Sequence, residues 1–159
     1  MERRRSGRAK RYRSRVNERD DAVPEPLGLV TYREGEALDA AEVAALFDDS
    51  GIRRPTHDLP RIAAMFAHAN LVISARQGER LVGVARALTD FSYCCYLSDL
   101  AVARDLQRAG VGRELVRRVR ERIGPQSMLL LLSAPEAMEY YPRLGFERVD
   151  NAFLVRRST

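Results

Sequence analysis

The six residues from Gln107 to Gly112 have the composition of an anion-binding loop. They read Gln-Arg-Ala-Gly-Val-Gly, after a strand-like run and directly before a strongly amphipathic segment. The N-terminus of a helix carries unpaired N–H groups and a partial positive charge. Glycines at 110 and 112 let the backbone approach an anion closely, and Gln107 and Arg108 offer side-chain donors. The sequence therefore predicts an anion site at a helix start.

The surroundings of this loop argue against two common nucleotide-binding loops. No Gly-Lys-Ser/Thr follows it, as a P-loop would require. Leu115 stands where a dinucleotide fingerprint would have its third glycine, and several elements precede the loop. A Gly-x-Gly pair is weak by itself, so the strand before it and the helix after it carry the prediction.

Apolar periodicity predicts the elements that must position the loop. Val111 to Ile123 has apolar residues every four positions and ends at Gly124-Pro125, as an amphipathic helix does. Two further helices should begin after Asp39 and Asp58, which suit N-caps, and a short one should span 135–143. Strands are predicted at 27–33, 71–75, 81–88, 93–102, 127–133, 146–149 and 153–157, with 127–133 buried on both faces. The predicted fold class is α/β (α+β), with a mixed, mostly antiparallel sheet of about seven strands and about four helices.

The charge of the chain is unevenly distributed. Residues 1–19 contain nine of the 27 Lys and Arg residues and two of the 22 Asp and Glu residues, so the rest is close to neutral. We expect residues 1–22 to form a disordered, Arg-rich tail and residues 23–159 to form one domain. Any nucleic-acid contact is expected through this tail alone.

Several other classes of protein are disfavoured by the sequence. No apolar run approaches the ~20 residues that span a bilayer, and residues 1–25 lack a secretory apolar stretch. The prediction is a soluble, cytoplasmic protein without a membrane contact. Cys94 and Cys95 are adjacent and would point to opposite faces of a strand, and the two His residues lie elsewhere, so no metal site is predicted.

Two separated motifs resemble those of one enzyme family. Residues 97–115 are similar to motif A of the GNAT acetyltransferase superfamily, in which Gln/Arg-x-x-Gly-x-Gly/Ala joins a strand to a helix. Tyr141-Pro-Arg-Leu-Gly-Phe146 is similar to that family's Tyr-x-x-Leu-Gly-Phe. The predicted order of elements also matches, and the resemblance covers about residues 27–158.

The resemblance implies a role for each matched residue. The backbone of the strand would pair with the pantetheine arm of acetyl-CoA and polarise its thioester carbonyl. Tyr141 would be the general acid that protonates the departing thiolate, a role that suits a phenol with a pKa of ~10. Its neighbour Tyr140 remains an alternative. The residues expected to bind acetyl-CoA are Leu100, Ala101 and Val102 on the strand, Gln107, Arg108, Ala109, Gly110, Val111 and Gly112 around the pyrophosphate, and Arg113 near a phosphate.

The resemblance leaves the acceptor side less defined. Asp99 is a candidate for the base or for a contact with the ammonium group, with Asp90 and a chain of waters as alternatives. The 53–58 loop is expected to help build the acceptor pocket, where His57 is either an exposed residue or a base. One departure concerns Ala134, because many family members have an Asn there that contacts pantetheine.

The resemblance thus implies transfer of an acetyl group from acetyl-CoA to the primary amine of a small molecule by direct attack. A homodimer is a further expectation from the family. Two alternatives stay open: a CoA-binding regulatory module without turnover, and a nucleic-acid-associated protein that acts through its tail. The presence of Tyr141 favours the enzyme over the regulatory module.

Overall fold

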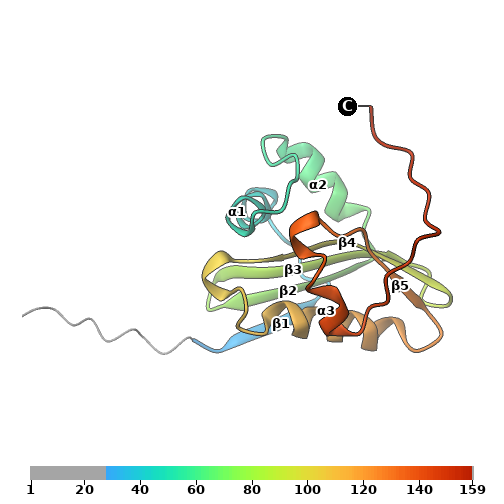
Figure 1. The fold of residues 1–159 in the computed structure, drawn as a ribbon. Helices are drawn as coiled ribbons and strands as arrows, with labels where there is room; N and C mark the ends of the chain where they lie inside the picture. Colours follow the sequence, from blue (N-terminus) through green and yellow to red (C-terminus); the bar gives the residue numbers. More distant parts are fainter. Residues whose placement is uncertain (1–27, 159) are drawn as a thin grey trace, which may run out of the picture.

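A five-stranded mixed sheet forms the centre of the fold (Figure 1). The computed structural model describes residues 28–158, so the predicted tail of residues 1–22 lies outside the described part. The spatial order is β1-β2-β3-β4-β5, with antiparallel neighbours except for the parallel pair β4 and β5. The strands are β1 (Val30–Glu34), β2 (Leu71–Gln77), β3 (Arg80–Thr89), β4 (Cys94–Val102) and β5 (Met128–Leu130).

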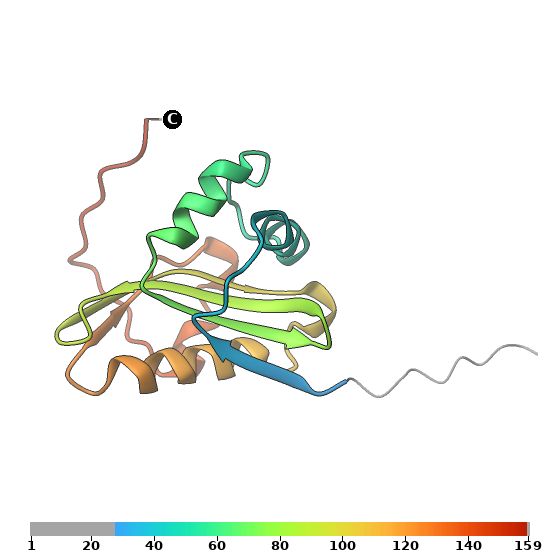
Figure 2. The same ribbon diagram turned by 180° about the vertical axis from the view of Figure 1, so that it is seen from behind.

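Three α-helices cover the two faces of the sheet. Helices α1 (Ala40–Ser50) and α2 (Leu59–Ala67) lie on one face and α3 (Val111–Ile123) lies on the other, as the two opposite views show (Figures 1 and 2). Asp39 caps α1 by accepting the N–H groups of Ala41 and Glu42, and Asp58 caps α2. Both predicted N-caps are therefore confirmed.

The core lies on both faces of the sheet, and one part of it fills the space between α3 and the middle strands. Leu115 and Val119 of α3 are fully buried, as the four-residue spacing predicts. Gly83 on β3 lies beneath them, and a Cβ at this position would be 3.1 Å from Val111 Cγ1 and 3.2 Å from Leu115 Cδ1. The missing side chain lets α3 approach the sheet closely, which fixes the start of the helix against β3 and β4.

The chain after α3 departs from the prediction. The apolar run at 127–133 forms a strand only at Met128–Leu130, and these residues are exposed or half-buried, not buried on both faces. The predicted helix at 135–143 is replaced by two short 3₁₀ turns, Pro135–Ala137 and Tyr141–Leu144. β5 is a three-residue edge strand, so most of the apolar run lies outside the sheet.

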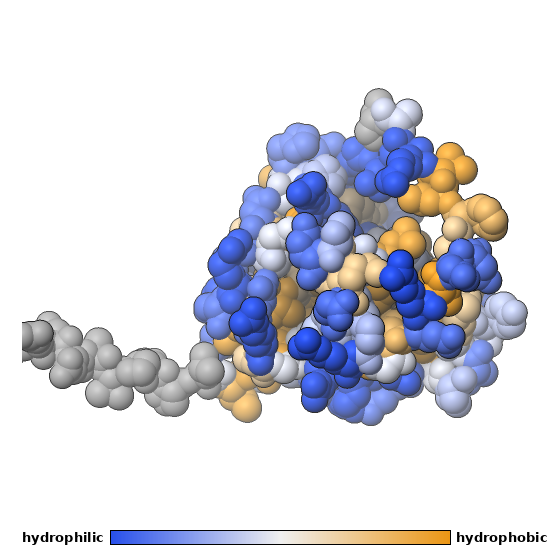
Figure 3. All heavy atoms as spheres, viewed as in Figure 1, coloured by the Kyte–Doolittle hydropathy of each residue, from blue (hydrophilic) through white to orange (hydrophobic). Residues whose placement is uncertain are grey.

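The predicted strands at 146–149 and 153–157 are also absent. These residues run past β5 as an extended segment without a paired strand, and the side chains of Phe153 and Val155 are 99% and 96% exposed. Orange, apolar residues along this segment are visible at the right of the space-filling view (Figure 3). A strand needs a partner for its backbone groups, which alternation alone does not supply. The described residues thus form five strands and three α-helices, while the predicted fold class is correct. No helix within residues 28–158 has the length and apolar character needed to cross a membrane.

Candidate active site

Strand β4 has an open edge beside the predicted anion loop. β5 pairs with β4 only from Cys94 to Tyr96. From Leu97 to Val102, the side of β4 that faces away from β3 has no strand partner among the described residues. The backbone groups on this edge can therefore pair with an extended ligand, as an added strand would. The three residues predicted to bind the pantetheine arm, 100–102, lie in this open stretch.

A β-bulge interrupts β4 near the start of the open edge. Arg86 faces Asp99 and Ala87 faces Leu97, so Ser98 is the extra residue on β4. A bulge turns the local backbone out of the regular ladder and re-aims its polar groups. This bulge therefore lies where a strand N–H could be directed at a bound carbonyl.

The loop that follows β4 ends in an uncapped helix N-terminus. Arg108 and Gly110 have left-handed backbone conformations, with φ of 68° and 91°. Gly110 is the N-cap of α3, and no side chain caps the helix there. The first N–H groups of α3 therefore remain available to an anion. Where a residue in the left-handed conformation adjoins one in the right-handed conformation, successive backbone N–H groups point into the same concave space, which can hold an anion.

The side chain of Gln107 connects this loop to the rest of the fold by hydrogen bonds. Its side-chain amide donates to the carbonyl oxygens of Ser50 and Val102, both at 3.1 Å. The amide thus links the loop to the end of α1 and to the end of β4. The structure uses this side chain to hold the loop, whereas the sequence suggested that it donates to the anion.

One tyrosine lies against the start of α3, and a second packs beside the first. The Tyr140 hydroxyl lies 2.6 Å from the position of a Cβ built on Gly112. The Tyr141 ring packs edge-on against the rings of Tyr140 and Phe146, with centroids 5.3 and 5.5 Å apart. Burial raises the pKa of Tyr141, a negative charge on Tyr140 would raise it further, and the Arg54 guanidinium opposes this. Burial also raises the pKa of Tyr140. Both phenols are therefore protonated at neutral pH.

Asp99 is buried between two arginines. Its side chain is fully inaccessible to solvent; Oδ1 accepts from Arg54 Nε at 2.5 Å, and Oδ2 accepts from Arg86 Nε. Arg54 also donates to the Ser98 carbonyl, and Arg86 donates to the Ser98 hydroxyl, each at 2.7 Å. Both oxygens of the Asp99 carboxylate are thus occupied by guanidinium groups. The geometry makes Asp99 a positioning residue for the two guanidinium groups.

The other candidate residues lie away from this cluster. Asp90 accepts three backbone N–H groups of the turn before β4, which lowers its pKa to about 2 and keeps it ionised. His57 is exposed in the loop before α2, and Ala134 is exposed before the first 3₁₀ turn. None of the three lines the pocket described next.

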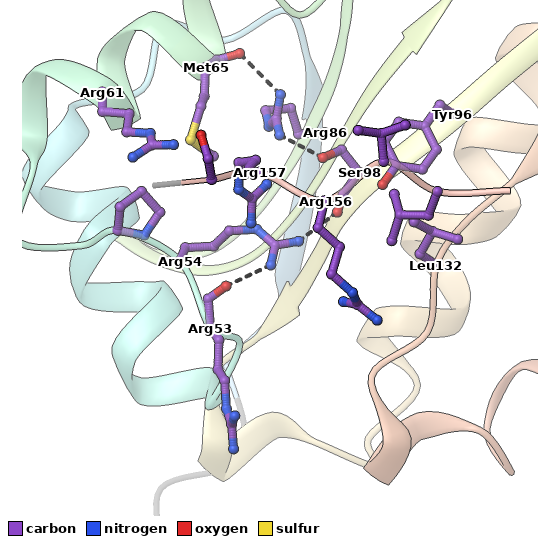
Figure 4. Close-up of a pocket in the computed structure, with 14 residues that line it drawn as sticks. Arg53, Arg54, Arg61, Met65, Arg86, Tyr96, Ser98, Leu132, Arg156 and Arg157 are labelled. Carbon is purple, nitrogen blue, oxygen red and sulfur yellow. Dashed lines mark hydrogen bonds between the residues drawn. The ribbon is translucent and has the colours of Figure 1, made fainter.

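A pocket of about 830 Å³ opens on the face of the sheet that carries α2 (Figure 4). It is bounded by the 53–55 loop, α2, the middle of β3 and β4, and the C-terminal segment. The expectation that the 53–58 loop helps to form a pocket beside β4 thus agrees with this geometry. Six of its lining residues are arginines: Arg53, Arg54, Arg61, Arg86, Arg156 and Arg157.

The sequence model of the acetyltransferase (GNAT) domain family matches residues 43–157 of the chain. The chain belongs to the GNAT family. The resemblance seen in the two motifs is therefore confirmed.

Individual relatives agree with this family. This GNAT protein is similar to the uncharacterized N-acetyltransferase ycf52 of Porphyra purpurea, with 29% identity over 114 residues. The aligned region covers 66% of this chain and 63% of that relative. It spans between 52% and 63% of the length of the curated relatives it matches.

Solved structures of the family share the fold. A candidate acetyltransferase from Deinococcus radiodurans R1 has a TM-score of 0.68 at 25% identity, over 82% of this chain and 91% of that one. The aminoglycoside N-acetyltransferase AAC(6')-Iy, solved in complex with CoA, has a TM-score of 0.64 at 16% identity, over 86% and 99% of the two chains.

The sequence of this GNAT protein indicated Asp99 but not its partner Arg86. Arg86 lies in the middle of β3 in the otherwise apolar run Leu81–Leu88, and it is only 6% exposed. A charge in a buried strand requires an opposite charge nearby. That partner is Asp99 on the neighbouring strand. A lone arginine in an apolar run could therefore have predicted a buried ion pair at this place.

Proposed function

We propose that this GNAT protein transfers an acetyl group from acetyl-CoA to the primary amine of a small molecule. The observation that carries the proposal is the open edge of β4 at Leu97–Val102, which leads directly into the uncapped N-terminus of α3. One surface thus offers strand-like pairing for an extended chain and N–H groups for an anion at its end. A pantetheine arm attached to a pyrophosphate has this arrangement of groups.

The residues present fit acetyl-CoA. Gly112 leaves one position in the first turn of α3 without a side chain, and no side chain caps the helix at the left-handed Gly110. The N–H groups of residues 110–113 would hold the pyrophosphate, with Arg108 and Arg113 as side-chain partners. Acetyl-CoA supplies the thioester, and the backbone of 100–102 would orient it beside the Ser98 bulge.

The chemistry would proceed by direct attack in a ternary complex. The amine nitrogen forms a bond with the acetyl carbonyl carbon as the carbon–sulfur bond breaks. A strand N–H at β4 stabilises the negative charge that develops on the carbonyl oxygen. Tyr141 gives its proton to the departing thiolate. The proton lost by the amine passes to water, from which the Tyr141 phenolate is protonated again.

The acceptor pocket is proposed to favour the neutral, reactive form of the amine. Arg53, Arg54 and Arg61 lie in its wall. Positive charges near an ammonium group lower its pKa and so release the free amine. A water molecule can then accept the proton, because the Asp99 carboxylate is already held by Arg54 and Arg86.

Fold neighbours that act on aminoglycosides support a small-molecule amine as the acceptor class. The proposal is tested with a panel of primary amines and acetyl-CoA, following release of the CoA thiol. We expect turnover on at least one amine, with one acetylated product formed per CoA released. Tight acetyl-CoA binding without turnover on any amine would instead indicate a regulatory CoA-binding module.

A further inference from the structure

The pocket beside β4 is far more positive than the domain around it. Outside residues 1–19 the chain has 18 basic and 20 acidic residues and is nearly neutral. The pocket, however, is lined by six arginines and by no acidic residue among the described ones. The carboxylate of Asp99 lies behind this wall, against Arg54 and Arg86, and does not itself line the pocket.

Only part of this charge is neutralised inside the protein. Arg54 and Arg86 share the single buried carboxylate of Asp99, which leaves one positive charge between them. The side chains of Arg33, Arg76 and Arg80, elsewhere in the domain, each form an ion pair. Within residues 28–158, no such pair is formed by Arg53, Arg61, Arg156 or Arg157.

These four arginines come from separate parts of the chain and meet around one opening. Arg53 precedes α2, Arg61 lies on α2, and Arg156 and Arg157 are on the C-terminal segment. Figure 4 shows the side chains of Arg61, Arg156 and Arg157 on the same side as the Arg54 guanidinium, and that of Arg53 directed away from them. Positive charges gathered around one opening raise the local concentration of anions, so the arrangement favours an anionic ligand.

The location of the pocket relates it to the acceptor rather than to the cofactor. Tyr96 and Ser98 line it, so it meets β4 where β5 separates from β4. The pyrophosphate loop begins α3 at the other end of β4 and on the opposite face of the sheet (Figure 2). A thioester lying along the open edge would therefore present its carbonyl between the two sites.

We infer that the acceptor amine carries an anionic group, a carboxylate or a phosphate, which the arginines of this pocket bind. The inference rests on the proposed acetyl transfer and specifies its substrate class. The guanidinium fork suits both oxyanions because it donates two parallel hydrogen bonds. A polycationic amine such as an aminoglycoside would be repelled by the same wall. The fold neighbours therefore indicate the reaction, and the pocket indicates a different kind of acceptor.

The experiment compares amines that differ only in the anionic group. The matched pairs are phosphoethanolamine with ethanolamine and 4-aminobutyrate with 4-aminobutyramide, and neamine serves as the polycation. We expect kcat/KM to be about tenfold or more higher for the anionic member of at least one pair, as charge-assisted hydrogen bonds would give. The preference should decrease as the salt concentration rises.

Two exposed arginines provide the matched variants. Arg61→Gln and Arg156→Gln each remove one charge from the pocket, and each should lower the ratio of anionic to neutral kcat/KM by about tenfold. Arg117→Gln is the control, because Arg117 lies on the exposed face of α3 and pairs there with Glu114 and Glu121. It should leave the ratio unchanged. Far-UV circular dichroism of all three variants reports whether they fold.

Three results would overturn the inference. Equal or better turnover of the neutral amines or neamine would exclude an anionic acceptor while leaving acetyl transfer intact. An increase in the KM for acetyl-CoA in the two pocket variants, with an unchanged ratio, would assign the arginines to the phosphates of CoA. No turnover on any amine would contradict the proposed function itself, and the inference with it.

Discussion

The hydroxyl of Tyr140 lies against Gly112, 2.6 Å from the position that a Cβ of residue 112 would occupy. The next nearest atom, Cζ of the same ring, is 3.6 Å away. The Tyr140 hydroxyl oxygen is therefore the one atom near enough to clash with a Cβ at position 112. This contact connects the C-terminal tyrosine pair to the loop that we propose binds the pyrophosphate.

Gly112→Ala is expected to weaken CoA binding through this contact. The new methyl group must displace the Tyr140 ring or the first turn of α3, whose N–H groups face the proposed anion. We expect the Kd of CoA to rise about tenfold, which corresponds to ~1.4 kcal/mol. Isothermal titration calorimetry with CoA measures the change.

The control for this variant is Tyr140→Phe in the same background. Without the hydroxyl, the added Cβ meets only Tyr140 Cζ and Val102 Cγ2, each at an ordinary distance of 3.6 Å. CoA binding should therefore recover relative to Gly112→Ala alone. The double variant should also be as stable as the parent or more so, because alanine favours a helix over glycine by about 1 kcal/mol. A double variant that binds CoA no better than Gly112→Ala would show that the contact does not govern the loop.

Tyr141→Phe should lower kcat by about 100-fold or more while changing the Kd of acetyl-CoA little, because the phenol is proposed to act only on the leaving thiolate. The pH profile provides a second measure. A proton donor works below its pKa, and burial raises the pKa of Tyr141 above its ordinary value of 10.0. Loss of the Tyr141 proton should therefore lower the kcat of the parent protein only above pH 10.

The variant should lack that alkaline decrease, and Tyr140→Phe serves as the comparison. An unchanged kcat in Tyr141→Phe, together with a large loss in Tyr140→Phe, would assign the proton to the neighbouring phenol.

Asp99→Asn should destabilise the fold strongly. The substitution leaves Arg86, with a side chain only 8% exposed, and Arg54 without their carboxylate. Removing one partner of a buried ion pair costs about 3 kcal/mol or more. The change in the free energy of unfolding is measured by urea denaturation.

Asp105→Asn is the matched control for this variant. Asp105 pairs with Arg80 at the surface, where both side chains are at least half exposed. Such a pair contributes at most about 1 kcal/mol. Equal, small effects of the two substitutions would show that Asp99 does not hold the pocket arginines in place.

The N-terminal two thirds of the fold could be predicted from local patterns. The strands from β1 to β4 and the helices α1, α2 and α3 each have a periodicity or a cap that identifies them, such as Asp39 before α1 and the four-residue spacing of α3. After Gly124 the same reasoning failed. An apolar run indicates that a segment can be buried, but it does not identify the helix or strand against which the segment would pack.

The candidate site divides in the same way. The candidate anion loop could be located from the sequence because it consists of consecutive residues, Gln107 to Gly112, directly before a helix. The role of the Gln107 side chain was not found, because its acceptors are the carbonyls of Ser50 and Val102, which only the fold brings near. The pocket arginines were likewise scattered from Arg53 to Arg157.

By itself, the sequence determined the family, the central strands and helices, and the loop at the start of α3. Each of these is encoded in a contiguous stretch, where backbone hydrogen bonding and side-chain periodicity act over short range. Only the tertiary structure decided the open edge of β4, the enclosure of Asp99 by Arg54 and Arg86, and the charge of the pocket. These features depend on which distant segments pack together, and electrostatic interactions respond to distance in space rather than to separation along the chain.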